Sequence, residues 1–210
     1  MNATKSKRQR NPWGEGERPK TELMDAAMRV LDSSPSAPLS LRKVALEAGI
    51  AAPSIYRHFS DVRELMSAIV RECWRQVGEA MSTEVRGNLD TDALSQLKAA
   101  MSGFVRYAMD RPSRYQLLFA MQPIEPEPSS GMDGYIRPAY RQILQIIKNY
   151  AESNEQLPAK DPPKATLLVL SLAHGRVALA HLSPDRVGNS PEDVEGFVID
   201  QIERIFASCD

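Results

Sequence analysis

Apolar residues recur at helical spacing along almost the whole of this 210-residue chain, and no other feature limits its fold as strongly. From about Pro19 to Ser33 they fall at i, i+4, i+7 and i+8, the pattern of one helical face, and later segments repeat it. No stretch alternates polar and apolar residues for longer than a few positions, and we find no internal repeat. The sequence therefore predicts an all-α fold, with helices over residues 19–33, 40–48, 52–60, 61–86, 91–110, 115–121, 138–150, 164–182 and 190–207.

Capping and turn residues divide the first third of the chain into short helices. Ser40 is placed to cap the second helix, and Gly49 supplies the turn that ends it. Pro53 suits the first turn of the third helix, where its missing N–H would have had no partner. Asp61 followed by Glu64 is an acidic variant of the capping box and starts the fourth helix. Two short helices joined by a tight glycine turn are typical of a helix-turn-helix.

Proline residues mark the breaks between the remaining helices. Pro112 is expected to interrupt the chain before the helix at 115–121, and Pro138 to lie in the first turn of the next one. Residues 122–134 hold three prolines and two glycines, so they are expected to form an irregular loop. The segment 164–182 is apolar nearly all round, which predicts a helix buried on more than one side.

Charge is divided unevenly along the chain. Residues 1–65 carry 11 Lys or Arg against 8 Asp or Glu, whereas residues 66–210 carry 15 against 19. Because attraction to phosphates depends on the charge near the contact, this division favours a polyanion-binding surface in the N-terminal third. Residues 1–17 lack apolar periodicity and are predicted to form a flexible basic arm.

The composition argues against several other classes of protein. Apolar residues make up 42% and charged residues 25%, as in soluble globular proteins. We find no apolar run approaching the roughly 18 residues that cross a bilayer and no secretory signal, so we expect a cytoplasmic protein without membrane contact. Cys73 and Cys209 lie far apart without the spacing of a zinc site. We expect no disulfide, metal or cofactor.

The stretch LSLRKVALEAGIAAPSIYRHFSDVRELM, residues 39–66, resembles the DNA-binding domain of the TetR family of bacterial transcriptional regulators. The resemblance covers about residues 18–70, and the later helices are similar in number and order to the family's ligand-binding and dimerisation domain. With the basic arm at 1–17, it implies a helix-turn-helix DNA-binding domain over 18–64 and an effector-binding and dimerisation domain over 65–210. The matching positions are Leu39, Val44, Ala45, Gly49, Ile50, Tyr56, His58, Phe59 and Leu65.

Two positions depart from the family pattern. Val62 replaces a lysine that contacts a phosphate in the family. Arg63 is adjacent but about 100° away around a helix, so whether it makes that contact stays open. Ala51 replaces the usual hydroxyl cap of the recognition helix, which is expected to cost about 1 kcal/mol of capping.

The resemblance assigns the third helix to the major groove of DNA. In a helix-turn-helix the N-terminal residues of the second helix reach base edges, while flanking groups contact phosphates. Arg57 is the candidate able to make a bidentate contact with guanine, and Phe59 is expected in the core. Tyr56 as a packing tyrosine, His58 as surface filler, and the arm as either a solvated tail or a minor-groove contact remain alternatives. The predicted base readers are Ala52, Pro53, Ser54 and Arg57, and the predicted phosphate contacts are Tyr56, His58, Lys20 and Arg42.

The resemblance also implies a homodimer and a small-molecule effector. Two copies of the segments 164–182 and 190–207 would form a four-helix bundle. A small, largely apolar effector would bind between the central helices and release a palindromic operator, as in a repressor; whether it releases or recruits DNA stays open. The predicted effector-binding residues are Trp74, Met101, Phe104, Tyr107, Tyr115, Phe119, Tyr140 and His174, with His174 the strongest candidate.

Two other functions compete with this one. An enzyme could use His174, His181 and several carboxylates, but no nucleophile, base and orienting group form a recognisable arrangement, so no catalytic residue is predicted. A helical adaptor or small-molecule-binding protein would use its helix-turn-helix for packing, without specific DNA binding. A steep salt dependence of duplex binding distinguishes the regulator from both.

Overall fold

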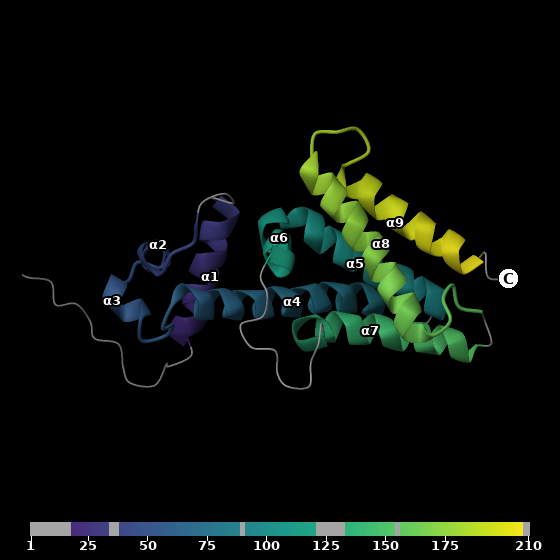
Figure 1. Cartoon of the computed structure of the whole chain (residues 1–210), viewed down its shortest axis with the longest axis horizontal. Coiled ribbons are helices and arrows are strands. Elements are labelled where there is room, and N and C mark those ends of the chain that lie inside the picture. Colours follow the sequence, from purple (N-terminus) through teal and green to yellow (C-terminus); the bar gives the residue numbers. More distant parts are fainter. Residues whose placement is uncertain (1–17, 34–37, 89–90, 121–132, 154–155, 208–210) are drawn as a thin grey trace, which may run out of the picture. The chain divides into compact units, whose positions relative to one another are not determined.

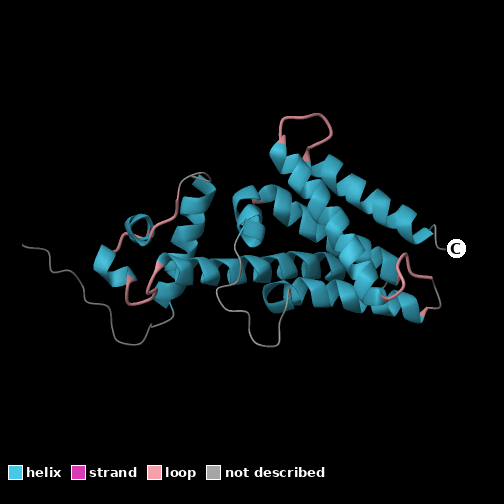
Figure 2. Ribbon diagram, in the orientation of Figure 1, coloured by secondary structure: helices cyan, strands magenta, loops and turns pink. Residues whose placement is uncertain are grey.

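The computed structural model describes residues 18–33, 38–88, 91–120, 133–153 and 156–207, and every regular element in these ranges is a helix (Figures 1 and 2). The all-α prediction is confirmed. The chain divides into two compact units, residues 1–65 and residues 66–210. The helices are α1 (Arg18–Ser33), α2 (Leu41–Glu47), α3 (Ala52–Ile55), α4 (Val62–Arg86), α5 (Ala93–Asp110), α6 (Pro112–Ala120), α7 (Asp133–Glu152), α8 (Pro162–Leu182) and α9 (Pro191–Ala207).

The first unit is built from short helices whose ends are set by local hydrogen bonds. The Ser40 side chain accepts a hydrogen bond from the Lys43 amide at 3.3 Å, as predicted for a cap of α2. Gly49 has a φ of +67°, a conformation that glycine adopts without steric cost, and it ends the helix. Helix α2 contacts both α1 and α3. The predicted helix-turn-helix is therefore present.

Helix α3 is shorter than the sequence predicts. The prediction extended it to residue 60, but it ends at Ile55 and residues 56–58 form turns. The amide of Arg57 donates to the carbonyl of Ser54, and that of His58 to the carbonyl of Ile55, so the chain tightens to i→i+3 bonding. Ala51, in the cap position, gives no side-chain hydrogen bond, as predicted. The missing cap and the tightened turn leave one turn of α-helix.

The second unit is organised around α5, which contacts α6, α7, α8 and α9. Gly103 lets α5 pass close to α4, because a Cβ atom at this position would lie 2.6 Å from the carbonyl oxygen of Ala80. The most buried large side chains of the unit include Met81, Leu97, Ile143 and Ile147. These residues are the apolar core against which α8 and α9 pack.

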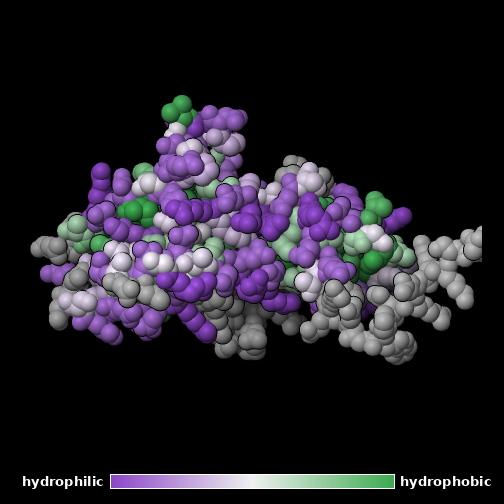
Figure 3. Space-filling view, turned by 180° about the vertical axis from the view of Figure 1, so that it is seen from behind, coloured by the Kyte–Doolittle hydropathy of each residue, from purple (hydrophilic) through white to green (hydrophobic). Residues whose placement is uncertain are grey.

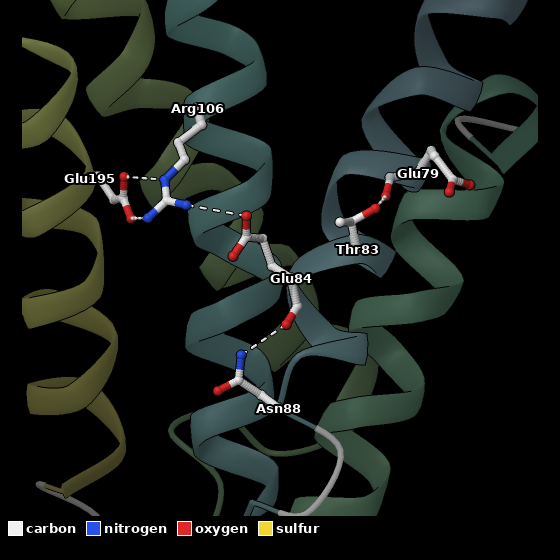
Figure 4. A network of polar contacts seen from close by, with 6 residues as sticks. All are labelled: Glu79, Thr83, Glu84, Asn88, Arg106 and Glu195. Carbon is white, nitrogen blue, oxygen red and sulfur yellow. Dashed lines mark hydrogen bonds and ion pairs between the residues drawn. The ribbon is translucent and has the colours of Figure 1, made fainter.

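An ion-pair network joins three helices of this unit (Figure 4). The guanidinium of Arg106 on α5 makes two hydrogen bonds to Glu195 on α9, at 2.7 and 2.8 Å. The same group donates to Glu84 on α4 at 3.1 Å, and the Asn88 side chain donates to the backbone carbonyl of Glu84. Arg106 therefore links α4 to α9 across the face of α5.

Two helices begin at residues that differ from the prediction. The break predicted at Pro112 is present, because α5 ends at Asp110 and Arg111 is not helical, but α6 begins at Pro112 and not at residue 115. Helix α7 begins at Asp133, so Pro138 does not lie in its first turn. The predicted loop at 122–134 lies outside the described residues except for Asp133 and Gly134, which are helical. The basic arm at 1–17 and Cys209 also lie outside them.

Within the described part of the chain, α8 has the length and apolar composition that a membrane-spanning helix needs. No unbroken apolar run in α8 approaches 18 residues, as expected from the sequence, but the helix meets the condition on average over its length. Polar residues such as His174 and Arg176 interrupt α8 without changing its average character. Core helices of soluble proteins meet the same condition, and α8 contacts α5, α7 and α9.

Candidate DNA-binding face and aromatic cluster

Six residues of α3 and the turn after it form a surface that we call the reading face: Ala52, Pro53, Ser54, Tyr56, Arg57 and His58. The Tyr56 side chain is 56% exposed, and Arg57 is also exposed. The Arg57 guanidinium donates to the Ser54 hydroxyl at 3.5 Å. This bond, which was not predicted from the sequence, places the Arg57 guanidinium beside the Ser54 hydroxyl on the outer surface.

Two buried side chains orient the reading face. Ile55 is fully buried and Phe59 is 1% exposed, as predicted for a core residue. The amide of Phe59 donates to the carbonyl of Ile55 at 3.0 Å, which closes the turn between them. Because both side chains point into the core, Tyr56 and Arg57 are directed to solvent. Arg57 and Tyr56 are therefore presented to solvent above two buried side chains.

Two predicted phosphate contacts lie on other helices of the first unit. The Lys20 ammonium on α1 lies 5.1 Å from the centre of the Phe59 ring, a cation–π contact. Arg42 is exposed in the first turn of α2. Arg63 is exposed and Val62 half-buried, so a cation is present next to the position where the family pattern has lysine.

The start of α4 is capped as predicted. The Asp61 carboxylate accepts a hydrogen bond from the Glu64 amide at 2.8 Å. The Glu64 carboxylate accepts from both the amide and the hydroxyl of Ser60, at 2.8 and 2.9 Å. The bonds from Ser60, assisted by the charge of Lys20, hold the pKa of Glu64 below its ordinary value of 4.5. The junction from the reading face into α4 is thus fixed by charged-group hydrogen bonds.

The second unit contains a contiguous group of rings. Tyr115 on α6 lies at its centre: its ring is 5.9 Å from Phe104, 5.1 Å from Phe119, 5.9 Å from His174 and 5.5 Å from His181. Phe119 also lies 4.0 Å from the His174 ring and 5.7 Å from Trp74. We call this group the aromatic cluster, defined as Trp74, Phe104, Tyr115, Phe119, His174 and His181.

The polar side chains of the aromatic cluster are buried, in Tyr115, or half-buried, in His174 and His181. The Tyr115 hydroxyl and His174 Nδ1 share a hydrogen bond of 2.7 Å. Burial raises the pKa of Tyr115 and lowers the pKa of His174 and of His181, because each charged form would lose solvation. All three groups are therefore uncharged at neutral pH, and the cluster favours apolar ligands with hydrogen-bonding groups.

The structure brings together five of the eight predicted effector-binding residues. Trp74, Phe104, Tyr115, Phe119 and His174 touch one another through their rings, as described above. His181 belongs to the same group and was missed, although its position seven residues after His174 places both on one side of a helix.

The other three predicted residues show no ring contact with this cluster among the described residues. Met101 is fully buried and Tyr140 half-buried. The Tyr107 hydroxyl donates to Gln76 at 3.4 Å instead. A role for these three in binding an effector remains a prediction.

Comparison with protein families decides the classification of the chain. Residues 23–69 match the model for bacterial regulatory proteins of the tetR family, and residues 97–205 match the model for the tetracyclin repressor-like C-terminal domain. The chain belongs to the TetR family. The first match includes the helix-turn-helix and its reading face. The second match begins within α5 and ends within α9.

Individual relatives agree with this classification. An uncharacterized HTH-type transcriptional regulator from Haemophilus influenzae is 31% identical over 137 residues, which are 65% of this chain and 63% of that protein. A protein of unknown function from Rhodococcus sp. RHA1 has a similar structure, with a TM-score of 0.75, 19% identity, and coverage of 95% of this chain and 99% of the other. A tetR-family regulatory protein from the same organism gives a TM-score of 0.70 at 17% identity, with coverage of 89% and 96%. At these identities the two structures establish the TetR fold alone.

Proposed function

We propose that this chain is a cytoplasmic transcriptional repressor of the TetR type, without enzymatic activity, that binds a palindromic operator as a homodimer. A small, largely apolar effector releases it from DNA. The observation that carries the proposal is the reading face: Tyr56 and Arg57 are exposed, while the side chains of Ile55 and Phe59 are buried in the core beneath the turn. Membership of a family of regulatory proteins supports it.

The side chains of the reading face and its neighbours suit two kinds of contact with duplex DNA, one with base edges and one with phosphates. Arg57 carries a planar fork that fits the two acceptors of guanine in the major groove, and such a contact is worth about 1 to 3 kcal/mol of discrimination. Ala52, Pro53 and Ser54 precede it and reach neighbouring base edges. Tyr56, His58, Lys20 and Arg42 contact phosphates, which set the register of the protein on DNA.

Exposed apolar side chains on α8 and α9 support a homodimer. Leu179 is 63% exposed and Leu182 is 79% exposed, although both belong to an apolar helix. Phe197 on α9 is 44% exposed, and Val187 is almost fully exposed on the loop between the two helices. That loop carries a hydrophobic tip in Figure 3. A second copy of α8 and α9 would cover these side chains. A dimer is also needed for specificity, because a monomer would read only one half-site of the DNA.

The aromatic cluster is the proposed effector site. Its rings supply apolar contact area, and the Tyr115 hydroxyl with the imidazoles of His174 and His181 supplies a few polar atoms. Phe119 is 42% exposed, so the cluster reaches the protein surface there. An effector releases DNA only to the extent that it binds the DNA-free conformation more tightly than the operator-bound one.

The DNA proposal is tested by fluorescence anisotropy of labelled duplexes at several salt concentrations. We expect the logarithm of affinity to fall steeply with the logarithm of salt, and Lys20→Ala or Tyr56→Phe to reduce that slope. Arg57→Ala should weaken binding and relax the preference for the guanine it contacts. Arg141→Ala, an exposed arginine on α7, is the control and should change neither. A flat salt dependence would favour a helical adaptor without specific DNA binding.

The dimer proposal is tested by light scattering coupled to size-exclusion chromatography. We expect a dimer in the unmodified protein and a shift toward monomer in Leu179→Glu. Leu46→Glu is the matched control, because Leu46 is 82% exposed on α2 in the first unit. Equal effects of the two substitutions would contradict the assignment of α8 to the dimer interface.

A further inference from the structure

One buried polar atom of the aromatic cluster lacks a partner. Among the described residues, His181 Nε2 is the buried side-chain nitrogen or oxygen for which the structure shows no hydrogen bond. The His181 ring does bond to the backbone carbonyl of Ala108. Because Nε2 has no partner, this bond belongs to Nδ1, which must carry a proton to donate to a carbonyl. His181 Nε2 is then a lone-pair acceptor that points at no donor.

An unfilled acceptor of this kind requires an explanation, because buried polar groups are almost always paired. Protonation of Nε2 would not remove the problem: burial lowers the pKa of His181, so the cationic ring is even less favourable in this environment. The atom can be satisfied by a donor that comes from outside the chain. That donor is either a water molecule or a ligand.

The surroundings of His181 indicate which ligand would supply the donor. Its ring lies edge-on to Tyr115 at 81°, and Tyr115 is in turn surrounded by Phe104 and Phe119. These neighbours offer flat apolar surfaces suited to an aromatic ring. A molecule that reaches Nε2 therefore needs an apolar, flat body and a single donor group.

The charged side chains close to Tyr115 in the sequence, Arg111 and Arg114, have other described partners. The Arg111 guanidinium lies 5.1 Å from the centre of the Tyr107 ring, and Arg114 donates to the Gln76 side chain at 3.5 Å. Arg176, two residues after His174, lies over the Phe197 ring at 5.6 Å. An ionised ligand would lose its hydration there without gaining an opposite charge.

We propose that His181 Nε2 accepts a hydrogen bond from the effector, and that the effector is an uncharged aromatic compound with one hydroxyl or N–H donor. The proposal rests on the effector site of the proposed function and adds its chemical class. His174, engaged with Tyr115, stacks its ring against Phe119 and contributes a wall to the same site.

The test uses NMR of the full-length protein labelled with ¹⁵N-histidine, because the chain has only three histidines and each reports on a different question. In the free protein we expect His181 to show the neutral tautomer protonated at Nδ1. The probes are 2-naphthol, 2-methylnaphthalene and 2-naphthoate, which share a ring system and differ in the donor and the charge. We expect 2-naphthol to shift the His181 Nε2 resonance, and to bind about tenfold tighter than either analogue.

A matched variant isolates the acceptor. His181→Asn keeps a donor for the Ala108 carbonyl and removes Nε2, so we expect it to fold and to bind 2-naphthol and 2-methylnaphthalene equally. Ser171→Asn, at an exposed position of the same helix outside the aromatic cluster, should keep the preference for 2-naphthol. Retention of that preference in His181→Asn would overturn the assignment of Nε2.

Three other results would also overturn the proposal. They are a free protein in which His181 is protonated at Nε2, equal or absent binding of 2-naphthol and 2-methylnaphthalene, and tighter binding of 2-naphthoate. Absent binding would leave an ordered water as the donor to Nε2. The DNA half of the proposed function is read separately at His58, whose resonances should move when operator DNA is added. The experiments can therefore contradict the proposed class of effector while supporting DNA binding. They can also contradict DNA binding while supporting the class of effector.

Discussion

The two candidate sites differ in how their side chains relate to the core. On the reading face Tyr56 and Arg57 are exposed, and a separate set, including Ile55 and Phe59, supplies the stability. In the aromatic cluster some of the proposed ligand contacts are themselves core residues: Trp74 and Tyr115 are 5% and 2% exposed. Function and stability are therefore separable in the first unit and coupled in the second.

The largest expected difference is between two aromatic residues of the first unit, the buried Phe59 and the exposed Tyr56. Phe59→Ala removes a fully packed ring and should cost about 3 to 5 kcal/mol of unfolding free energy. Tyr56→Ala should change stability by about 0.5 kcal/mol or less, while weakening operator binding. Amide hydrogen exchange of residues 18–65 measures the first quantity and anisotropy the second. A large loss of stability in Tyr56→Ala would contradict the separation.

The second test applies the same question to the aromatic cluster. Tyr115→Phe keeps the ring but removes the hydroxyl, so His174 Nδ1 loses its partner. We expect a loss of about 1 to 3 kcal/mol, measured by urea denaturation, together with weaker binding of 2-naphthol. Tyr56→Phe is the control, because Tyr56 is 56% exposed in the first unit and lies outside the aromatic cluster. A change in binding without any change in stability would break the proposed coupling.

A smaller effect concerns the missing cap of α3. Ala51→Ser restores a hydroxyl at the cap position and should stabilise the first unit by about 1 kcal/mol. Because the substitution leaves Arg57 in place, sequence preference should not change. Ala52→Ser lies one residue beyond the cap and should give no such gain in hydrogen-exchange protection. If the two serines stabilise α3 equally, capping is not the reason for its short length.

The smallest effect is a pH dependence at the start of α4. Hydrogen bonds from Ser60 lower the pKa of Glu64 below 4.5 in the folded protein, so its contribution is complete above that value and is lost as the pH falls through the lowered pKa. Hydrogen-exchange protection near Ser60 should decrease over this range. Glu64→Gln cannot titrate, and we expect its protection to vary less with pH. Identical profiles would contradict this role of Glu64.

Local features of the fold could be predicted from the sequence because their causes are local. The caps at Ser40 and Asp61, the glycine turn at Gly49 and the burial of Phe59 each depend on a few adjacent residues. The end of α3 was predicted too late, because helical periodicity does not distinguish a full turn from the tightened bonding after Ile55.

Long-range features were predicted less well. The contact of His181 with Tyr115 joins residues on different helices, and the unpaired state of Nε2 depends on which groups of other helices surround it. Neither follows from spacing along the chain. Close approach of α4 and α5 at Gly103 likewise becomes visible only when both backbones are in place.

Selection of bound duplexes from a random DNA pool tests the central claim most directly. The reading face and the exposed apolar surfaces of α8 and α9 lead us to predict a palindromic sequence with two half-sites and a guanine that Arg57→Ala no longer selects. Enrichment of a sequence without two-fold symmetry would contradict the dimer. Absence of any enriched sequence, with the protein folded, would contradict specific DNA binding.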